Sequence, residues 1–352
     1  MTATSYDRYG LAGNPFRELA SENISDIELF HVNLEIDDTL HAVIDEVLSK
    51  ENRAIVAVVG EHGSGKTERL MMAATEAKQR KAFTVYFDVT SKTPWILRGL
   101  AEEFRKTAEQ SGLTKTFSSP AWMRALAPIE KLKDEKYDPI AAGRAIGQAL
   151  NDTAPSLLLL NDLHNLMESK EIHAFAKTLQ QVSDVIKPGV LIMFDCFPSY
   201  LAWLTVNLAP FASRINRTIR LPGLTSDEAA LLLAKKMLPK RMVEDLDPIY
   251  PFDKESVVAL NEAAGGNPRR LIELADLSIE FGASHKLYRV DSNVVRVVQP
   301  LRTSALAAGS VAGRTTPPVT KEQYSEEPST KSAGPAKPAP IAGAQTTGGK
   351  SG

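Results

Sequence analysis

The residues of this chain best able to do chemistry lie in one short stretch, Gly-Glu-His-Gly-Ser-Gly-Lys-Thr at positions 60–67. The stretch is a complete G-x-x-x-x-G-K-[ST] pattern, which is typical of a phosphate-binding loop. Its glycines, at positions 60, 63 and 65, allow positive φ angles, so that successive backbone N–H groups can turn toward one anion. Lys66 can reach the β- and γ-phosphates of a nucleotide, and the Thr67 hydroxyl can bind Mg²⁺.

The loop therefore predicts a site for a nucleoside triphosphate and Mg²⁺. The helix that begins at about Lys66 would point its positive end at the same phosphates. We expect contacts from the whole loop and from the residue after it: Gly60, Glu61, His62, Gly63, Ser64, Gly65, Lys66, Thr67 and Glu68.

A second polar group follows four consecutive leucines at positions 157–160. Asn161 and Asp162 stand where the Walker B pattern has two acidic residues, the first for a Mg²⁺-bound water and the second for the attacking water. Because parallel strands turn their carboxyl ends to the ligand crevice, we expect this pair beside the phosphate loop. An amide lacks the negative charge and Asp162 is shorter than glutamate, so slow hydrolysis is expected. Alternatively, Asp162 binds the metal together with Thr67, and no dedicated base is present.

Two further candidates follow later strands. Asp195, at the tip of a strand, is a candidate for contact with the γ-phosphate or the attacking water, and Ser199 is the second choice. A cap or turn role is the alternative for Asp195. Arg214 could reach the γ-phosphate of a neighbouring subunit as an arginine finger. Alternatively, it is a solvated arginine in a basic surface segment with Arg217 and Arg220.

The sequence Gly-Gly-Asn-Pro-Arg-Arg at positions 265–270 has the features of a helix start, because a capping asparagine precedes a proline. Arg269 then lies in the first helical turn, where the helix dipole disfavours a cation. A γ-phosphate nearby would compensate for this, and so would a salt bridge to a local carboxylate.

Strands and helices must alternate to position these residues. Short apolar segments predict buried parallel strands at 54–59, 83–89, 157–160, 190–194 and 218–221. Helical patterns separate them at 36–49, 68–80, 95–109, 139–151 and 172–186. A capping box at 225–228 opens a region that reads as helical to about 298, with helices at 228–238, 254–264 and 268–281.

The predicted fold class is α/β: a parallel five-stranded P-loop NTPase sheet flanked by helices, followed by a small all-α lid and a disordered tail. The expected boundaries are an N-terminal segment at 1–30, the nucleotide-binding domain at 31–223, the lid at 224–300 and the tail at 301–352. The tail is rich in Ser, Thr, Ala, Gly and Pro, and so has little apolar surface to bury.

The composition limits the partners and the compartment. A net charge of −2 gives no overall attraction to nucleic acid, so any such contact needs a local patch. The single cysteine, Cys196, excludes an internal disulfide, is expected in the core and fits a reducing compartment. No stretch reads as a membrane span or a signal peptide, so we expect a cytoplasmic protein with no membrane partner.

Together these elements resemble the AAA+ ATPases, in the branch of archaeal origin-recognition initiators, TniB/TnsC transposition regulators and ExeA-type ATPases. The resemblance covers about residues 8–300. It rests on Tyr9-Gly10-Leu11 with Asn14-Pro15-Phe16, the phosphate loop, Asn161-Asp162-Leu163-His164-Asn165-Leu166, Ser213-Arg214 and Gly266-Asn267-Pro268-Arg269-Arg270.

The resemblance implies that Arg269 is sensor 2, that Asp195 lies near sensor 1 and that Arg214 is the arginine finger. It also implies that ATP is the nucleotide, hydrolysed to ADP and phosphate, and that the protein is an oligomerising switch. The expected partners are further copies of the chain, in a ring or filament, and double-stranded DNA or a DNA-processing protein complex. Asn161 departs from the family pattern and implies a weak ATPase.

A second departure concerns DNA. Initiators carry a winged-helix domain after the lid, whereas the ordered part of this chain is expected to end near Val298, so DNA would bind the AAA+ surface itself. The cations and aromatics of Lys106–Lys136 are one candidate surface, and a solvated loop with one buried tryptophan is the other interpretation. The alternative function is a signalling or scaffold ATPase in which the nucleotide is mainly structural and the partners are proteins.

Overall fold

A computed structural model of the chain describes residues 6–17, 32, 34–89, 96–111, 121–130 and 137–308, and for 301–308 it describes only the backbone. The phosphate loop, the ends of all the predicted strands and the predicted lid lie within these ranges. Lys115, Phe117, Lys131, Lys133 and Lys136, from the basic candidate surface, lie outside the described residues.

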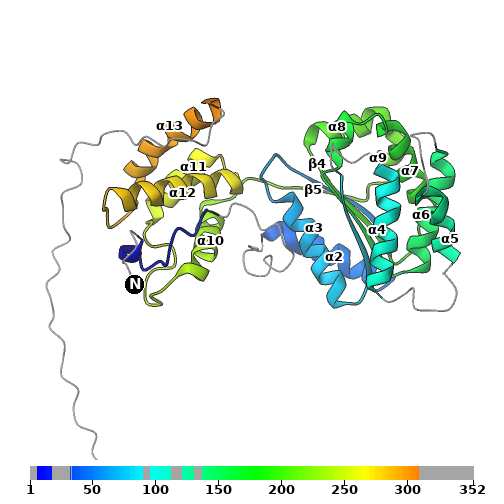
Figure 1. Cartoon of the computed structure of the whole chain (residues 1–352), viewed down its shortest axis with the longest axis horizontal. Helices are drawn as coiled ribbons and strands as arrows, with labels where there is room; N and C mark the ends of the chain where they lie inside the picture. The colour runs from blue at the N-terminus through cyan, green and yellow to red at the C-terminus, as the bar shows by residue number, and fades with distance from the viewer. Residues whose placement is uncertain are drawn as a thin grey trace, which may run out of the picture. The chain divides into compact units, whose positions relative to one another are not determined.

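A parallel sheet forms the centre of the α/β domain (Figure 1). Its order is β2-β3-β4-β1-β5, and every neighbouring pair is parallel. The strands are β1 (Ala54–Val59), β2 (Phe83–Asp88), β3 (Ser156–Asn161), β4 (Val190–Cys196) and β5 (Arg217–Arg220). The predicted fold class is confirmed, and every predicted strand exists within a few residues of its expected bounds.

Helices cover both faces of the sheet, which is why β1, β3 and β4 are buried at every position. Side chains of one face, among them Val56 and Val58, pack with α2 (Glu35–Leu48) and α3 (Lys66–Gln79). Alternate side chains of the same strands pack on the other face with the remaining helices. These are α4 (Ile96–Gln110), α5 (Ala121–Glu130), α6 (Pro139–Asp152), α7 (Ile172–Val185), α8 (Pro198–Asn207) and α9 (Ala209–Ala212).

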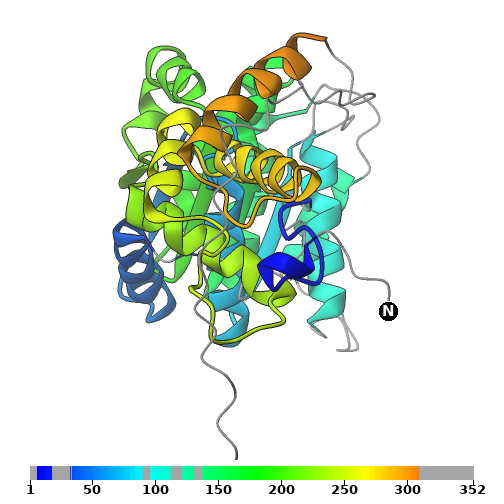
Figure 2. The ribbon, with the colours of Figure 1, turned by 90° about the vertical axis from the view of Figure 1, so that its left-hand side faces the viewer.

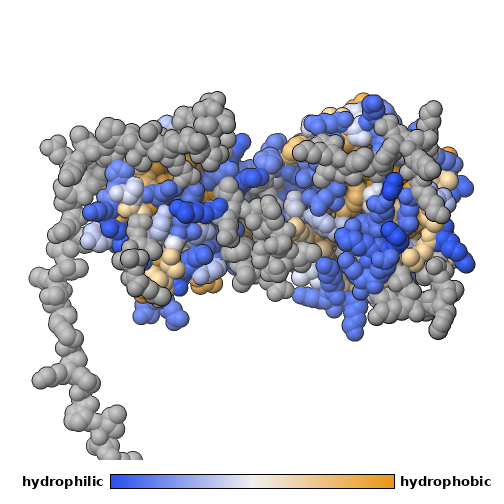
Figure 3. Space-filling model, in the orientation of Figure 1, coloured by the Kyte–Doolittle hydropathy of each residue, from blue (hydrophilic) through white to orange (hydrophobic). Residues whose placement is uncertain are grey.

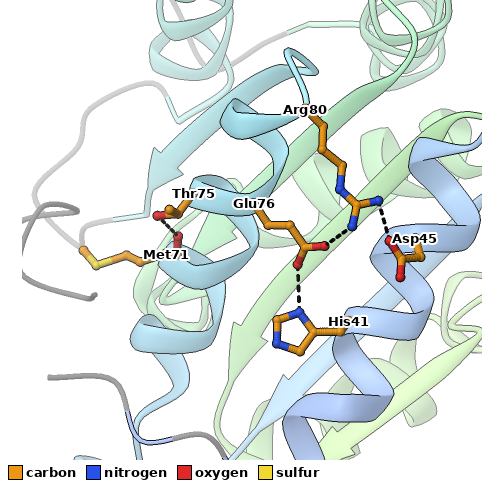
Figure 4. A network of polar contacts seen from close by, with 6 residues as sticks. All are labelled: His41, Asp45, Met71, Thr75, Glu76 and Arg80. Atoms are coloured by element: carbon orange, nitrogen blue, oxygen red, sulfur yellow. Dashed lines mark hydrogen bonds and ion pairs between the residues drawn. The ribbon is translucent and has the colours of Figure 1, made fainter. Parts of the chain in front are cut away.

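The helices α2 and α3 are also joined by a polar network near the surface (Figure 4). His41 Nδ1 lies 2.9 Å from one carboxylate oxygen of Glu76, and Arg80 Nη2 donates to the other at 2.8 Å. Arg80 forms a second ion pair with Asp45 of α2. Because α3 begins at the phosphate loop, these contacts help to fix the helix that the loop leads into.

The second domain is helical. It contains α10 (Ser226–Met237), α11 (Lys254–Ala264), α12 (Pro268–Ser284) and α13 (Ser292–Ala308), with short 3₁₀ segments such as Leu238–Lys240. The capping box of α10 is present, since Thr225 accepts from the Glu228 N–H and the Glu228 carboxylate accepts from the Thr225 N–H. The last helix runs to Ala308, so the tail expected from residue 301 is helical in its first residues.

The N-terminal segment 6–17 packs on this helical domain, beside the yellow and orange helices in Figure 2. Tyr9 is fully buried with its ring 6.4 Å from that of Tyr250, and the Phe16 and Phe252 rings are 6.0 Å apart. Asn14 Nδ2 donates to Asp276 of α12 at 2.6 Å. The sequence analysis treated residues 1–30 as a separate segment, but the described part of it completes the core of the lid.

The part of the chain that the structure describes contains no helix long and apolar enough to cross a membrane. Hydrophilic residues cover most of the coloured surface in Figure 3, and the apolar residues form small separate patches on that face.

Candidate functional site

The phosphate loop connects the end of β1 to the start of α3, as the sequence predicts. Gly63 and Gly65 have φ angles of +79° and +90°, which side chains with a Cβ rarely adopt. The sequence predicts a positive φ at Gly60 as well. Gly60 does not have one, so that expectation is wrong. A Cβ at Gly60 would collide with the Ser64 side chain, and so the requirement there is space.

Lys66 is held inside the loop. Only 6% of the residue is exposed, and its Nζ donates to the carbonyl oxygen of Glu61 at 3.0 Å. The ammonium also lies 4.7 Å from the centre of the Phe197 ring. Burial lowers the pKa of Lys66, although the carboxylates of Asp195 and Asp162 oppose this shift. A phosphate oxygen can replace the carbonyl as partner and would bring the negative charge that a buried ammonium needs.

A cavity of about 810 Å³ opens over this loop, which is a typical size for a small-molecule site. Its polar lining residues include those of the loop and of the carboxyl ends of β2 and β3, together with Lys236 of the lid. Its apolar lining residues include Val32, Leu34, Pro222, Leu224, Leu232 and Ile272. A lining of both kinds suits a ligand that carries phosphates and a flat ring.

Asn161 and Asp162 line the cavity together with the phosphate loop, as expected from the strand that places them. Asn161 is 7% exposed, and its Nδ2 donates to Asp88 Oδ1 at 2.7 Å and to Asp162 Oδ2 at 3.5 Å. Asn161 Oδ1 is buried and has no hydrogen-bond partner among the described residues. The Asp162 side chain is 43% exposed, so its carboxylate can reach a ligand in the cavity.

The backbone of Asp162 is left-handed, with φ of 54°. Asp tolerates this conformation better than most residues, and such values are common at functional sites. The Asp162 N–H donates to Asp195 Oδ1, which helps to hold the turn. Asp195 is fully buried and does not line the cavity. Asp195 would therefore act on a ligand through its neighbours, by its hydrogen bond to the Asp162 N–H and by its charge near Lys66.

Burial raises the pKa of Asp195 to about 7, and the nearby Asp162 carboxylate adds to the shift. We expect the wild-type chain to lose stability relative to an Asp195→Asn variant as the pH rises from about 4 to about 7. The unfolded carboxyl releases its proton near its usual pKa of about 3.9, whereas the native one holds it until about 7. The native state thus binds more protons in this window, and the free energy of unfolding falls as the pH rises.

Denaturant unfolding of both proteins at pH 5 and pH 8 measures this effect. The asparagine keeps an acceptor oxygen for the Asp162 N–H but does not titrate, so it is a matched reference. A stability difference that is the same at both pH values would contradict the prediction.

The lid reaches the loop through the start of α12. Asn267 Nδ2 donates to the His62 carbonyl oxygen at 2.8 Å, and the Arg269 N–H donates to the Gly63 carbonyl oxygen at 3.3 Å. Arg269 Nη1 lies 2.9 Å from His62 Nε2. The local carboxylate considered in the sequence analysis is also present, since Arg269 Nε is 3.8 Å from Glu273 Oε1. The structure thus brings Arg269 and the phosphate loop together.

Comparison with known proteins identifies the sheet and its loop. Residues 49–194, from the end of α2 to β4, match the family model of the AAA domain. The matched stretch makes up about two fifths of this chain, and it is similar to the AAA domain over that length. This finding agrees with the resemblance drawn from the motifs, and the matched residues include the phosphate loop.

Solved structures are similar in fold over most of this chain. The ORC1 protein of Aeropyrum pernix, solved in complex with DNA, is similar with a TM-score of 0.52 and 13% identity over 83% of this chain and 70% of that one. Cdc6p from Pyrobaculum aerophilum has a TM-score of 0.51 and 13% identity, over 80% of this chain and 68% of that one. At these identities the likeness is one of fold.

One curated relative is an uncharacterised HTH-type transcriptional regulator of Methanocaldococcus jannaschii. It is 26% identical over 114 residues, which are 32% of this chain and 28% of that protein. The chain therefore matches less than a third of the length of this relative.

Arg214 and Ser199 lie outside the cavity, as do Asp195 and the first two loop residues, Gly60 and Glu61. Arg214 follows α9, where its Nη2 is 2.5 Å from Asp184 Oδ1 and its Nη1 donates to the Pro210 carbonyl. Arg214 does not line the cavity of its own chain. An arginine finger acts on the nucleotide of a neighbouring subunit, so this position agrees with that role. Ser199 is exposed in the first turn of α8 and does not line the cavity, so the structure gives no support to this second choice.

The candidate nucleic-acid surface is not assembled in the described residues. One of the two interpretations was a solvated loop with one buried tryptophan. The structure instead has a helix at Ala121–Glu130. Trp122 is buried and packs edge-on against Phe83, with ring centres 5.9 Å apart. It is therefore not available to stack on bases, whereas Arg124 of the same helix is exposed.

The sequence analysis missed Asp88, whose side chain lines the cavity and binds Asn161. A signal was available, because Asp88 ends a predicted strand and so had to lie at the same edge of the sheet as Asn161. It also missed His164, which lines the cavity. Burial lowers the pKa of His164. The centre of its ring lies 3.7 Å from that of the Phe197 ring, which also contacts the Lys66 ammonium.

Proposed function

We propose that this chain binds ATP with Mg²⁺ in the AAA cavity and acts as an oligomerising switch with slow ATP hydrolysis. We further propose that the switch is coupled to double-stranded DNA or to a DNA-processing protein complex. The observation that carries the proposal is the contact between the lid and the phosphate loop. Arg269 and Asn267 of α12 hold His62, so a ligand that occupies the loop acts on the lid directly.

Two cations of the site have partners that a phosphate can replace. Lys66 donates to a backbone carbonyl, and Arg269 contacts a histidine ring at 2.9 Å and the Glu273 carboxylate at the longer distance of 3.8 Å. Hydrogen bonds between charged groups are about twice as strong as those with neutral partners. A triphosphate in the loop would therefore draw both side chains toward its terminal phosphate, and the lid would follow Arg269.

Residues of the cavity fit Mg²⁺, which prefers oxygen ligands and keeps several waters. Thr67 and Asp162 line the cavity, and Asn161 presents a buried oxygen that accepts no hydrogen bond from the part of the chain that the structure describes. We propose that Thr67 and Asp162 hold the ion with the phosphates. When bound, Mg²⁺ would neutralise the charge that develops on the transferred phosphoryl group.

Slow hydrolysis follows from the residues at the end of β3. Asn161 carries no charge, and Asp162 is a short side chain on a left-handed backbone position, which restricts where its carboxylate can lie. We propose that Asp162 polarises the attacking water poorly. Each loss of about 1.4 kcal/mol in transition-state stabilisation slows the reaction tenfold.

We propose that ATP assembles the chain into a ring or filament. Arg214 would then serve a neighbouring subunit's γ-phosphate, exchanging its ion pair with Asp184 for the phosphate. Light scattering of the full chain with ATP, with ADP and without nucleotide tests this step. A larger particle with ATP alone supports the switch, and one molar mass in all three conditions contradicts it.

Replacing Arg269 by alanine is expected to weaken ATP binding by roughly tenfold to a hundredfold and to leave ADP binding almost unchanged. The reason is the loss of a charge-assisted contact worth roughly 1.5–3 kcal/mol that only the γ-phosphate receives. Calorimetric titration with both nucleotides measures the effect. Arg270→Ala is the matched control, because Arg270 is the adjacent arginine, is exposed and does not line the cavity. Equal losses for ATP and ADP would contradict the role of a γ-phosphate sensor.

Coupling to DNA is proposed from the fold shared with the ORC1 protein, which was solved in complex with DNA. The alternative is a scaffold ATPase with protein partners, which the uncharged Asn161 favours. Binding of the full chain to duplex DNA, measured against salt with and without ATP, separates the two, because phosphate contacts make affinity fall steeply with salt.

We place the protein in the cytoplasm, an inference supported by its single, buried cysteine, Cys196.

A further inference from the structure

The carboxylate of Asp88 and the amide of Asn161 form a pair at the edge of the nucleotide cavity. They are register partners at the ends of the neighbouring strands β2 and β3. The Asn161 Nδ2 donates to Asp88 Oδ1 at 2.7 Å, and both residues line the cavity. Asp88 is exposed, whereas Asn161 is almost entirely buried.

This pairing fixes the direction of the Asn161 amide. The two groups next to Nδ2 are the carboxylates of Asp88 and Asp162, and an ionised carboxylate can only accept hydrogen bonds. The NH₂ group must therefore face them, and Oδ1 must face away. That oxygen is buried and accepts no hydrogen bond from the described residues. A buried acceptor without a donor is costly, and because Asn161 lines the cavity, a ligand there can supply the donor.

We propose that Asp88 and Asn161 together replace the acidic residue that usually serves Mg²⁺ at the end of this strand. Asn161 Oδ1 accepts a hydrogen bond from a Mg²⁺-bound water. Asp88 is a positioning residue that orients the Asn161 amide and supplies the missing negative charge one strand away. The inference rests on the proposed function, since it concerns the ion that accompanies ATP.

The proposal predicts different effects for single and double substitutions of Asp88 and Asn161. Changing Asn161 to aspartate alone would place a second carboxylate against Asp88, and like charges so close disfavour full ionisation of both. Changing Asp88 to asparagine alone would leave two amides and no charge. Only the exchange of both residues restores one carboxylate and one amide in contact.

The experiment measures the Mg²⁺ dependence of ATP binding in four full-length proteins: wild type, Asp88→Asn, Asn161→Asp and the double exchange. ATP affinity is titrated from a chelator solution to saturating Mg²⁺. Outer-shell partners of metal ligands typically change metal affinity tenfold to a hundredfold. We expect each single variant to need roughly tenfold more Mg²⁺ for half of its effect, and the double exchange to return to within about threefold of wild type. ATP binding without Mg²⁺ is measured for each protein as well, so that the Mg²⁺ requirement is compared separately from the direct effect of the changed charge on ATP.

Asp152→Asn is the matched control. Asp152 accepts a hydrogen bond from the Gln148 amide at 2.6 Å on α6, and neither residue lines the cavity. The change therefore removes the charge from a carboxylate–amide pair that is outside the nucleotide site. It should leave the Mg²⁺ dependence at the wild-type value. Thermal unfolding of every variant shows which are folded, and if Asp88→Asn is not, Asn161→Asp and the double exchange still give the comparison.

An unchanged Mg²⁺ requirement in the single variants would overturn the inference, and so would a double exchange no better than Asn161→Asp. A pair that is merely structural would change stability without changing the Mg²⁺ requirement. Failure of the proposed function looks different, because the wild-type protein itself would then not bind ATP at any Mg²⁺ concentration.

Discussion

Replacing Lys66 by alanine is expected to weaken ATP binding by roughly tenfold to a hundredfold. The ammonium is buried inside the loop, with a backbone carbonyl and an aromatic ring as its near neighbours, so a phosphate would be its main anionic partner. A charge-assisted contact of this kind contributes roughly 1.5–3 kcal/mol. Titration of ATP into the wild-type and variant proteins measures the change.

Lys78→Ala is the control for this experiment, because Lys78 is an exposed lysine on the same helix, α3. It should bind ATP as the wild type does. If Lys66→Ala bound ATP with unchanged affinity, the loop would not be the phosphate site, and the proposed function would be wrong at its base.

Replacing Asp37 by alanine is expected to lower the free energy of unfolding by about 3 kcal/mol, because it would remove the two-pronged carboxylate partner of a buried guanidinium. Arg69 would keep its longer contact with Glu68, at 3.4 Å. Asp37 of α2 is 1% exposed and Arg69 of α3 is 3% exposed. Arg69 Nε and Nη2 donate to the two carboxylate oxygens of Asp37 at 3.0 and 3.1 Å. Denaturant unfolding at neutral pH measures the loss.

The chain offers a second ion pair between the same two helices as the control. Asp45 of α2 pairs with Arg80 of α3 at the surface, where the Asp45 side chain is 58% exposed (Figure 4). Removing one partner of such an exposed pair changes stability by about 1 kcal/mol or less. Similar losses for Asp37→Ala and Asp45→Ala would show that burial of the first pair has no energetic consequence.

The buried pair also bears on the phosphate site. Arg69 lies directly behind the loop, and a Cβ at Gly65 would be 2.8 Å from its Nη1. Because Asp37 holds Arg69 from α2, the first turn of α3 is fixed from behind. The loop is thus supported through Asp37, which does not itself line the cavity.

Features encoded by short stretches of sequence could be predicted, and most were. The phosphate loop, the strand before it and the parallel sheet follow from local apolar runs and glycine spacing. The start of α12 was predicted from Asn267 and Pro268, and the structure shows the asparagine capping the helix, with its Oδ1 accepting from the Arg270 N–H. Such signals span a few residues, and so they do not depend on how distant elements pack.

Features that depend on register or on distant contacts were not predicted. The loss of charge at Asn161 is visible in the sequence, but its partner Asp88 is 73 positions away and meets it only because β2 and β3 pair in this register. The packing of Tyr9 on the lid is of the same kind. The helices α5 and α8 were not predicted. A proline lies inside α5 and another begins α8, and the mixed polar and apolar residues around them weaken the periodic pattern.

The central claim is that a triphosphate is held jointly by the phosphate loop and by Arg269 of the lid. A crystal structure of the full chain with Mg²⁺ and a non-hydrolysable ATP analogue tests it most directly. We predict that Lys66 Nζ and the Arg269 guanidinium both lie within about 3.2 Å of oxygens of the terminal phosphate, with Arg269 released from His62. A bound analogue with Arg269 still on His62 and turned away from the phosphates would contradict the account.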